Sequence, residues 1–79
     1  LKNLPIKYIK IDGSYIKNIC HNELDAVVVK TITEAAKKMS IQTVAEFVKD
    51  EATLDRVSDL GIDYAQGYCV DKPQAIEMH

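Results

Sequence analysis

The chain has 79 residues, of which 47% are hydrophobic and 28% are charged, and its formal net charge is -2. This composition is that of an ordinary globular domain and excludes a disordered or collagen-like chain. The small negative charge gives no electrostatic reason to expect binding to nucleic acid or contact with a membrane, and no apolar run approaches the roughly 18 residues of a transmembrane helix.

The first predicted element is a strand over residues 6–12, which are rich in β-forming side chains and follow Pro5. Gly13 and Ser14 predict a turn after it. Asn22 is a suitable N-cap for a helix over residues 23–39. The apolar residues of this helix recur at helical spacing on one face, and they are Leu24, Val27, Val28, Ile32, Ala35 and Met39.

The second half of the chain repeats this order. Residues 42–46 predict a strand, Asp50 caps a helix that runs to Leu60, and Gly61 is the expected residue after its end. The buried stripe of this helix would consist of Leu54, Val57 and Leu60. Residues 62–69 predict a third strand, and Asp71, Lys72 and Pro73 predict the start of a final helical turn.

The resulting order, β-α-β-α-β-(α) with short connections, predicts parallel strands joined by right-handed crossovers. Side chains alternate along each strand, and one face is small or apolar, which suits packing against helices. The other face becomes polar toward the carboxyl end, as the inside of a (β/α)8 barrel does at its mouth. This polar face carries Tyr8, Lys10 and Asp12, then Val44 and Glu46, then Tyr64, Gln66 and Tyr68. A doubly wound sheet would need apolar residues on both faces, so the pattern favours the barrel.

Lys10, Glu46 and Gln66 lie at equivalent positions, where each predicted strand ends. A charged group on an otherwise apolar strand is costly to bury without partners or a ligand. The carboxyl ends of parallel strands meet at one edge, where α/β proteins carry their chemistry. These three residues therefore predict one shared site.

Three stretches carry a family resemblance: LPIKYIKIDGSYI, then TVAEFV with the following DEATLDRVSDLGIDYAQGY, and a trailing KP. In this order and spacing they resemble the last three βα units of the EAL domain, a family that hydrolyses the bacterial second messenger cyclic di-GMP. The resemblance implies that residues 1–79 form the carboxyl-terminal third of a TIM-like (β/α)8 barrel, with parallel strands inside and helices on the outer face. It implies cyclic di-GMP as the partner.

The resemblance also implies residue roles. Lys10, in the KID motif, resembles the lysine that hydrogen-bonds a metal-bound attacking water. Glu46 resembles the glutamate that completes a metal site, so it is both catalytic and the metal ligand here. Gln66 and Tyr68, in the QGY motif, resemble substrate-binding residues of the pocket wall. The chemistry would be in-line hydrolysis of a phosphodiester to linear pGpG, assisted by two Mg²⁺ or Mn²⁺ ions.

Some family features differ or are absent. The EAL signature, the downstream Asn and Glu ligands and the paired aspartates of the DDFG segment belong to strands before residue 1, so we expect the 79-residue chain alone to be inactive. The family's EGVE reads EFVK, with Phe47 for Gly and Lys49 for the second Glu. That Glu anchors a loop of the metal site in the family, so Lys49 argues against full activity. Lys72 stands where the family often has Arg.

Other interpretations remain open. The parent protein could be a degenerate EAL domain that senses cyclic di-GMP without cleaving it, or the chain could be an interaction fragment without a ligand. Lys10 and Glu46 could form only a structural pair, with Asp12 as another partner for Lys10. Gln66 could be a satisfied core amide, and the tyrosines could serve only packing.

The environment of the chain is predicted from simpler features. Cys20 and Cys69 lie far apart without Cys-x-x-Cys spacing, which indicates reduced thiols and a cytoplasmic segment. Three strands taken from a barrel would leave unpaired edges at both ends of the sheet, so we expect self-association of the isolated chain.

Overall fold

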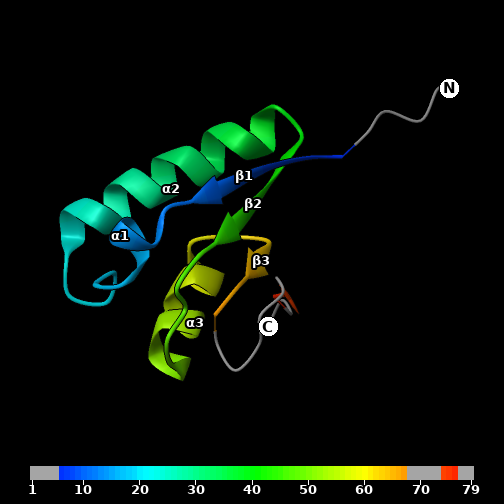
Figure 1. Cartoon of the computed structure of the whole chain (residues 1–79). Helices are drawn as coiled ribbons and strands as arrows, with labels where there is room; N and C mark the ends of the chain where they lie inside the picture. Colours follow the sequence, from blue (N-terminus) through cyan, green and yellow to red (C-terminus); the bar gives the residue numbers. More distant parts are fainter. Residues whose placement is uncertain (1–5, 68–73, 77–79) are drawn as a thin grey trace, which may run out of the picture.

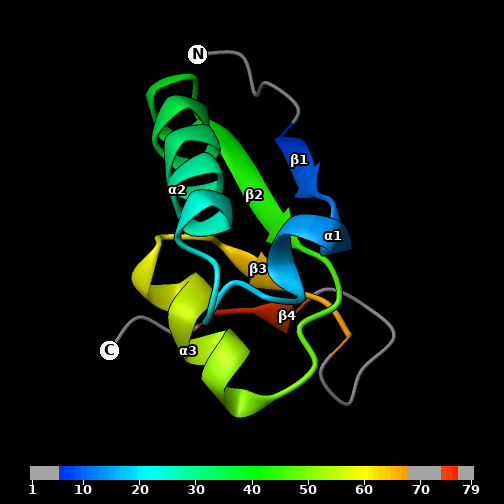
Figure 2. The same ribbon diagram turned by 90° about the vertical axis from the view of Figure 1, so that its left-hand side faces the viewer.

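The computed structural model describes residues 6–67 and 74–76. Their elements, in chain order, are β1 (Lys7–Ile11), α1 (Gly13–Ile16), α2 (Glu23–Lys38), β2 (Ile41–Ala45), α3 (Glu51–Asp59), β3 (Tyr64–Ala65) and β4 (Gln74–Ala75). The strands form one sheet in the order β1-β2-β3-β4. The pairs β1–β2 and β2–β3 are parallel, as predicted, and α2 and α3 lie on the same side of the sheet (Figures 1 and 2).

The predicted helix caps are confirmed. The Asn22 side chain accepts a hydrogen bond from the Asp25 amide at 3.1 Å and begins α2. The Asp50 side chain accepts one from the Thr53 amide at 2.8 Å and begins α3. Gly61 follows the end of α3 with a φ of 88°, a left-handed conformation that glycine adopts without strain.

The predicted turn at Gly13 and Ser14 is instead the start of the one-turn helix α1. Asp12 is its N-cap, and its Oδ1 accepts a hydrogen bond from the Ser14 amide at 2.8 Å. This cap satisfies an amide that a plain turn would leave to solvent, so the chain continues as a helical turn. The helix buries Gly13 and Ile16 against the rest of the core.

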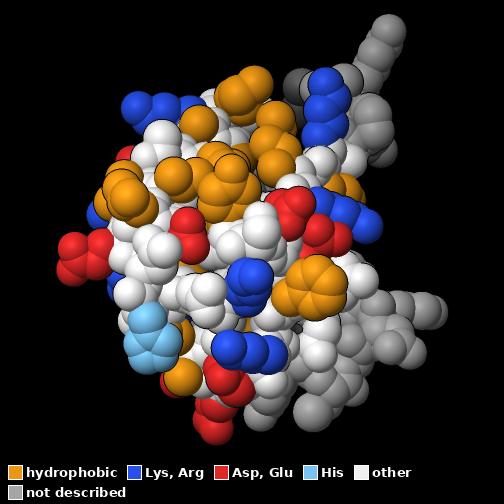
Figure 3. All heavy atoms as spheres, turned by 60° about the vertical axis from the view of Figure 1, so that its left-hand side comes forward, with side chains coloured by type: hydrophobic (Ala, Val, Ile, Leu, Met, Phe, Trp, Pro, Cys, Tyr) orange, Lys and Arg blue, Asp and Glu red, His pale blue; other side chains and the backbone are white. Residues whose placement is uncertain are grey.

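The face of α2 that packs inward is not the one that apolar spacing defines. The buried residues of α2 are Ala26, Val29, Thr33 and Ala36, whereas Leu24 and Val27 are 76% and 60% exposed. The small side chains allow close packing against β2, and the Thr33 hydroxyl donates to the Val29 carbonyl at 2.7 Å. The exposed apolar side chains gather over α2 (Figure 3).

In α3 the predicted buried stripe is only partly correct. Val57 is buried, but Leu54 and Leu60 are half-buried, and Thr53 takes the other buried position. The core joins this helix to the sheet through Val57, Ile62 and Ala65, and it continues under α2 through Val29 and Ala45.

The end of the sheet corrects two predictions. Of residues 62–67 of the predicted third strand, only Tyr64 and Ala65 form β3, and residues 68 and 69 lie outside the described part of the chain. The predicted start of a final helical turn at Asp71, Lys72 and Pro73 lies outside the described residues. Its continuation is wrong at Gln74 and Ala75, which form β4 antiparallel to β3. An unpaired strand edge leaves amide and carbonyl groups without partners, and β4 pairs with that edge of β3. The outer strands of the described sheet are therefore β1 and β4, and not β1 and β3 as predicted.

No helix in the described residues is long and apolar enough to cross a membrane.

Candidate functional site

The inner face of the sheet carries its side chains in rows that cross the strands. Lys10 pairs with Val44, and Val44 pairs with Tyr64, so these three residues form one row. With Tyr8 they line a cavity of about 320 Å³. Because helices cover the opposite face, this cavity lies on the side that would face the interior of a closed barrel.

Glu46 and Gln66 each follow directly after a strand and are still held by its hydrogen bonds. The Glu46 amide donates to the Ile11 carbonyl at 3.2 Å, and the Gln66 amide donates to the Ala45 carbonyl at 2.9 Å. Each residue lies two positions beyond a member of the Lys10 row, and therefore on the same face. The structure thus brings Lys10, Glu46 and Gln66 to one carboxyl edge, and Tyr68 lies outside the described residues.

Lys10 is exposed and Glu46 is half-buried. Within residues 6–67 and 74–76, no ion pair joins Lys10 to Asp12 or Glu46. The described residues therefore do not contain the structural ion pair that was one interpretation of Lys10.

Asp12, predicted only as an ion-pair partner of Lys10, lies next to this edge. It follows directly after β1, two positions beyond Lys10, and its side chain caps α1. The hydrogen bond from the Ser14 backbone amide, followed by one from the Ser14 side chain, lowers the pKa of the Asp12 carboxyl from its ordinary value. The alternation of side chains along the first predicted strand already placed Asp12 on the same face as Lys10.

Tyr8 and Tyr64 pack across the inner face. Their ring centroids are 5.7 Å apart with an interplanar angle of 67°, an edge-to-face contact that spans from β1 to β3. The proximity of Tyr8 raises the pKa of the Tyr64 phenol, and desolvation adds to this. The Tyr64 phenol therefore stays neutral at physiological pH and packs against the Tyr8 ring.

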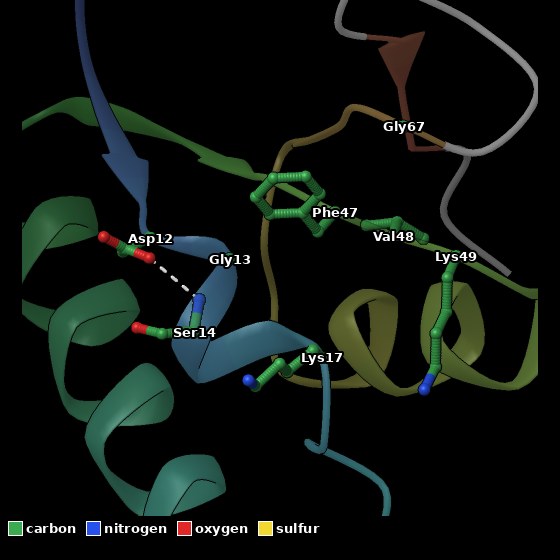
Figure 4. A pocket seen from close by; sticks show the side chains of 8 residues that line it. All are labelled: Asp12, Gly13, Ser14, Lys17, Phe47, Val48, Lys49 and Gly67. Atoms are coloured by element: carbon green, nitrogen blue, oxygen red, sulfur yellow. Dashed lines mark hydrogen bonds between the residues drawn. The ribbon is translucent and has the colours of Figure 1, made fainter.

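A second pocket, of about 520 Å³, lies among the loops that follow β1, β2 and β3 (Figure 4). Phe47 lies at its centre with a φ of 59° and 69% of its surface exposed. Its ring covers Gly13, where a Cβ would collide with it. Lys17 and Lys49 point away from this ring on the opposite side from Gly67 (Figure 4). The full lining is Asp12, Gly13, Ser14, Lys17, Phe47, Val48, Lys49 and Gly67.

The donors at this edge suit a hard divalent cation only in part. The carboxylates of Glu46 and Asp12 are oxygen ligands of the kind that Mg²⁺ and Mn²⁺ prefer. However, no group of three or more His, Cys, Asp or Glu side chains in the described part of the chain could hold a metal ion. These residues therefore offer carboxylates to a metal site but do not form one by themselves.

Parallel strands, helices on one face only and polar side chains at the carboxyl edge define consecutive βα units of a parallel barrel. The EAL domain profile matches residues 1–73. The chain belongs to the EAL domain family.

Relatives with named activities agree with this assignment. The chain is 45% identical over 76 residues to the cyclic di-GMP phosphodiesterase PdeB of Shewanella oneidensis, covering 96% of the chain and 9% of that protein. It is also 45% identical over 76 residues to the cyclic di-GMP phosphodiesterase PdeF of Escherichia coli, covering 96% of the chain and 10% of that protein. The chain thus spans about a tenth of these relatives.

Among solved structures, the chain superposes on the PaMucR phosphodiesterase in complex with c-di-GMP. The TM-score is 0.75 at 30% identity, over 91% of this chain and 29% of that one. The fold is therefore that of an EAL domain, a TIM-like barrel, of which the described residues form three parallel strands with their helices as an open sheet.

Proposed function

We propose that residues 1–79 are the carboxyl-terminal third of a barrel that hydrolyses cyclic di-GMP to linear pGpG. The observation that carries the proposal is the placement of Lys10, Glu46 and Gln66 on one face, at one carboxyl edge. A cation, a carboxylate and an amide at a barrel mouth are groups that can hold a water and a phosphodiester in fixed positions.

Each residue has a distinct part in this proposal. Lys10 holds the attacking water by a hydrogen bond and stabilises the negative charge that develops on the phosphoryl oxygens. Glu46 supplies a carboxylate to a Mg²⁺ or Mn²⁺ site, where the ion would lower the pKa of bound water and stabilise the leaving oxygen. Gln66, with Tyr68, binds the substrate at the pocket wall. The water oxygen forms a bond to phosphorus, the bond to the ribose oxygen breaks, and that oxygen takes up a proton.

The remaining metal ligands must come from other strands of a complete barrel, since the described residues lack a three-ligand cluster. The 79-residue chain by itself should therefore not turn over cyclic di-GMP. A test needs the missing strands, and the solved PaMucR phosphodiesterase provides them. We define the chimeric barrel as that protein with its matching segment replaced by this chain.

The expected result is release of pGpG from cyclic di-GMP by the chimeric barrel with Mg²⁺ or Mn²⁺. Lys10→Met should abolish turnover, because it keeps the length of the side chain but removes the charge. Lys17→Met is the matched control, since Lys17 lies at the second pocket and not on the inner face. A folded chimeric barrel in which Lys10→Met stays fully active would overturn the proposed role of Lys10.

A second candidate function is a sensor that binds cyclic di-GMP without cleaving it. Lys49 favours this candidate, because it places a positive charge where the family has a glutamate that anchors a loop of the metal site. Calorimetry separates the candidates. Binding of cyclic di-GMP without release of pGpG would support the sensor, and a folded chimeric barrel with neither binding nor turnover would support an interaction fragment.

A further inference from the structure

Asp63 and Thr43 form a reciprocal contact between β2 and the start of β3. The Asp63 Oδ2 accepts hydrogen bonds from the Thr43 amide at 2.9 Å and from the Thr43 hydroxyl at 3.3 Å. The Asp63 amide in turn donates to the Thr43 hydroxyl oxygen at 3.2 Å. Thr43 is only 1% exposed, so water competes little for these bonds.

This contact lies beside a short stretch of parallel backbone pairing. Five residue pairs join β1 to β2, whereas only two, Val44 with Tyr64 and Ala45 with Ala65, join β2 to β3. A shift of one residue in a strand turns all of its side chains to the opposite face. Beyond this ladder the Gln66 backbone bonds to Ala45 and Val48, so the contact between Asp63 and Thr43 reinforces a short backbone pairing at its other end.

The contact and the proposed site lie at opposite ends of this short ladder. Thr43 precedes Val44 directly and Asp63 precedes Tyr64 directly, while Glu46 and Gln66 follow at the other end. The Gln66 amide donates to the Ala45 carbonyl at 2.9 Å, and the Gln66 carbonyl accepts from the Val48 amide at 3.0 Å. A β3 strand shifted by one residue would break both bonds and turn the Gln66 side chain away from the inner face.

We infer that Asp63 and Thr43 are positioning residues that fix the register of β3 and so place Gln66 beside Glu46 at the substrate pocket. This inference rests on the proposed function for the roles of Gln66 and Glu46. Loss of the contact should affect β3 and not β2, because β2 keeps its five residue pairs with β1. Loss of the contact therefore displaces Gln66 and leaves Glu46 in place.

A displaced Gln66 beside an unmoved Glu46 should change the KM for cyclic di-GMP in the chimeric barrel without changing the Mg²⁺ dependence. Asp63→Ala and Thr43→Val should raise the KM for cyclic di-GMP about tenfold, which corresponds to the loss of roughly one substrate hydrogen bond. The Mg²⁺ concentration that gives half-maximal rate should not change, since Glu46 has not moved. Thr43→Ser keeps the hydroxyl and is the conservative control that should retain the original KM.

A purely structural role gives a different result. Partial unfolding would lower the fraction of active protein and so reduce kcat, with the KM and the Mg²⁺ dependence unchanged. An unchanged KM in Asp63→Ala would overturn the inference, whether or not kcat falls. A parallel rise in the Mg²⁺ requirement would overturn it too, because Glu46 would then have moved as well.

Amide hydrogen exchange provides a readout that does not need activity. Asp63→Ala should speed exchange over residues 62–67 and leave residues 7–11 unchanged, both in the 79-residue chain and in the chimeric barrel. Unchanged exchange over residues 62–67 in the chimeric barrel would refute the register role. If the unsubstituted chimeric barrel is inactive, the proposed function fails, while exchange still decides whether this contact sets the register.

Discussion

Phe47 occupies a backbone conformation that residues with a side chain rarely adopt, and its replacement gives a sharp test of the loop after Glu46. Its φ is 59°, which lies in the left-handed region. Glycine accepts this conformation without a steric penalty, and the EAL family has glycine here. The phenylalanine ring compensates in part, because it covers Gly13.

The two contributions can be separated by comparing glycine with alanine. The left-handed conformation costs a residue with a Cβ roughly 1–2 kcal/mol. The ring is 69% exposed, so about a third of a side chain of roughly 200 Å² is covered, which contributes about 1.5 kcal/mol. Phe47→Ala loses the ring and keeps the strain, whereas Phe47→Gly loses both. After about 0.4–1 kcal/mol for the greater unfolded-state entropy of glycine, Phe47→Gly should be more stable than Phe47→Ala by roughly 0.5–1 kcal/mol.

Urea unfolding of the chimeric barrel measures this difference as a shift in midpoint at constant slope. The same pair of substitutions at Lys49 is the control, since Lys49 is not among the residues with positive φ. There the usual order, alanine more stable than glycine, should hold. If Phe47→Ala proves as stable as Phe47→Gly, the backbone at position 47 carries no strain and the reasoning is refuted.

Three further predictions concern the caps and the open edge. Asn22→Ala should destabilise α2 by about 1 kcal/mol in urea unfolding, whereas Asn22→Ser should not. Hydrogen bonds from the Thr53 side chain and backbone lower the pKa of the Asp50 carboxyl from its ordinary value of 3.8. The ionised cap therefore stabilises the folded chain fully above pH 3.8, and this stabilisation is lost as the pH falls through the lower pKa of the folded state. Asp50→Asn should make the urea unfolding midpoint depend less on pH in this acid range. The 79-residue chain should self-associate through the edge of β1, and sedimentation of a monomer at all concentrations would contradict this.

The location of the candidate site was predictable from the sequence because it depends on local rules. Side chains alternate between the two faces of a strand with a period of two. Lys10, Glu46 and Gln66 therefore share one face if they occupy equivalent positions at the carboxyl ends of their strands. The caps Asn22 and Asp50 were predictable for the same reason, since a cap depends on a side chain and an amide two or three residues later.

The features that the sequence did not reveal depend on partners distant in the chain. The helix α2 has two candidate faces, and packing on β2 selects the one with small residues such as Ala26 and Ala36. Both faces recur at helical spacing within residues 23–39, so the sequence of the helix alone does not decide between them. The strand β4 is defined by its pairing with the edge of β3. A strand of two residues is too short to show a periodicity in the sequence.

The antiparallel pairing of β4 with β3 has a consequence for how a complete barrel closes. Every strand of a closed (β/α)8 barrel is flanked by two parallel neighbours, yet Tyr64 and Ala65 already bond to an antiparallel segment on one side. In a closed barrel of that kind, a parallel strand would have to stand beside β3 in the place that β4 takes here. In the isolated chain, β4 covers this edge of β3, so a second molecule that paired at this end of the described sheet would meet β4 instead.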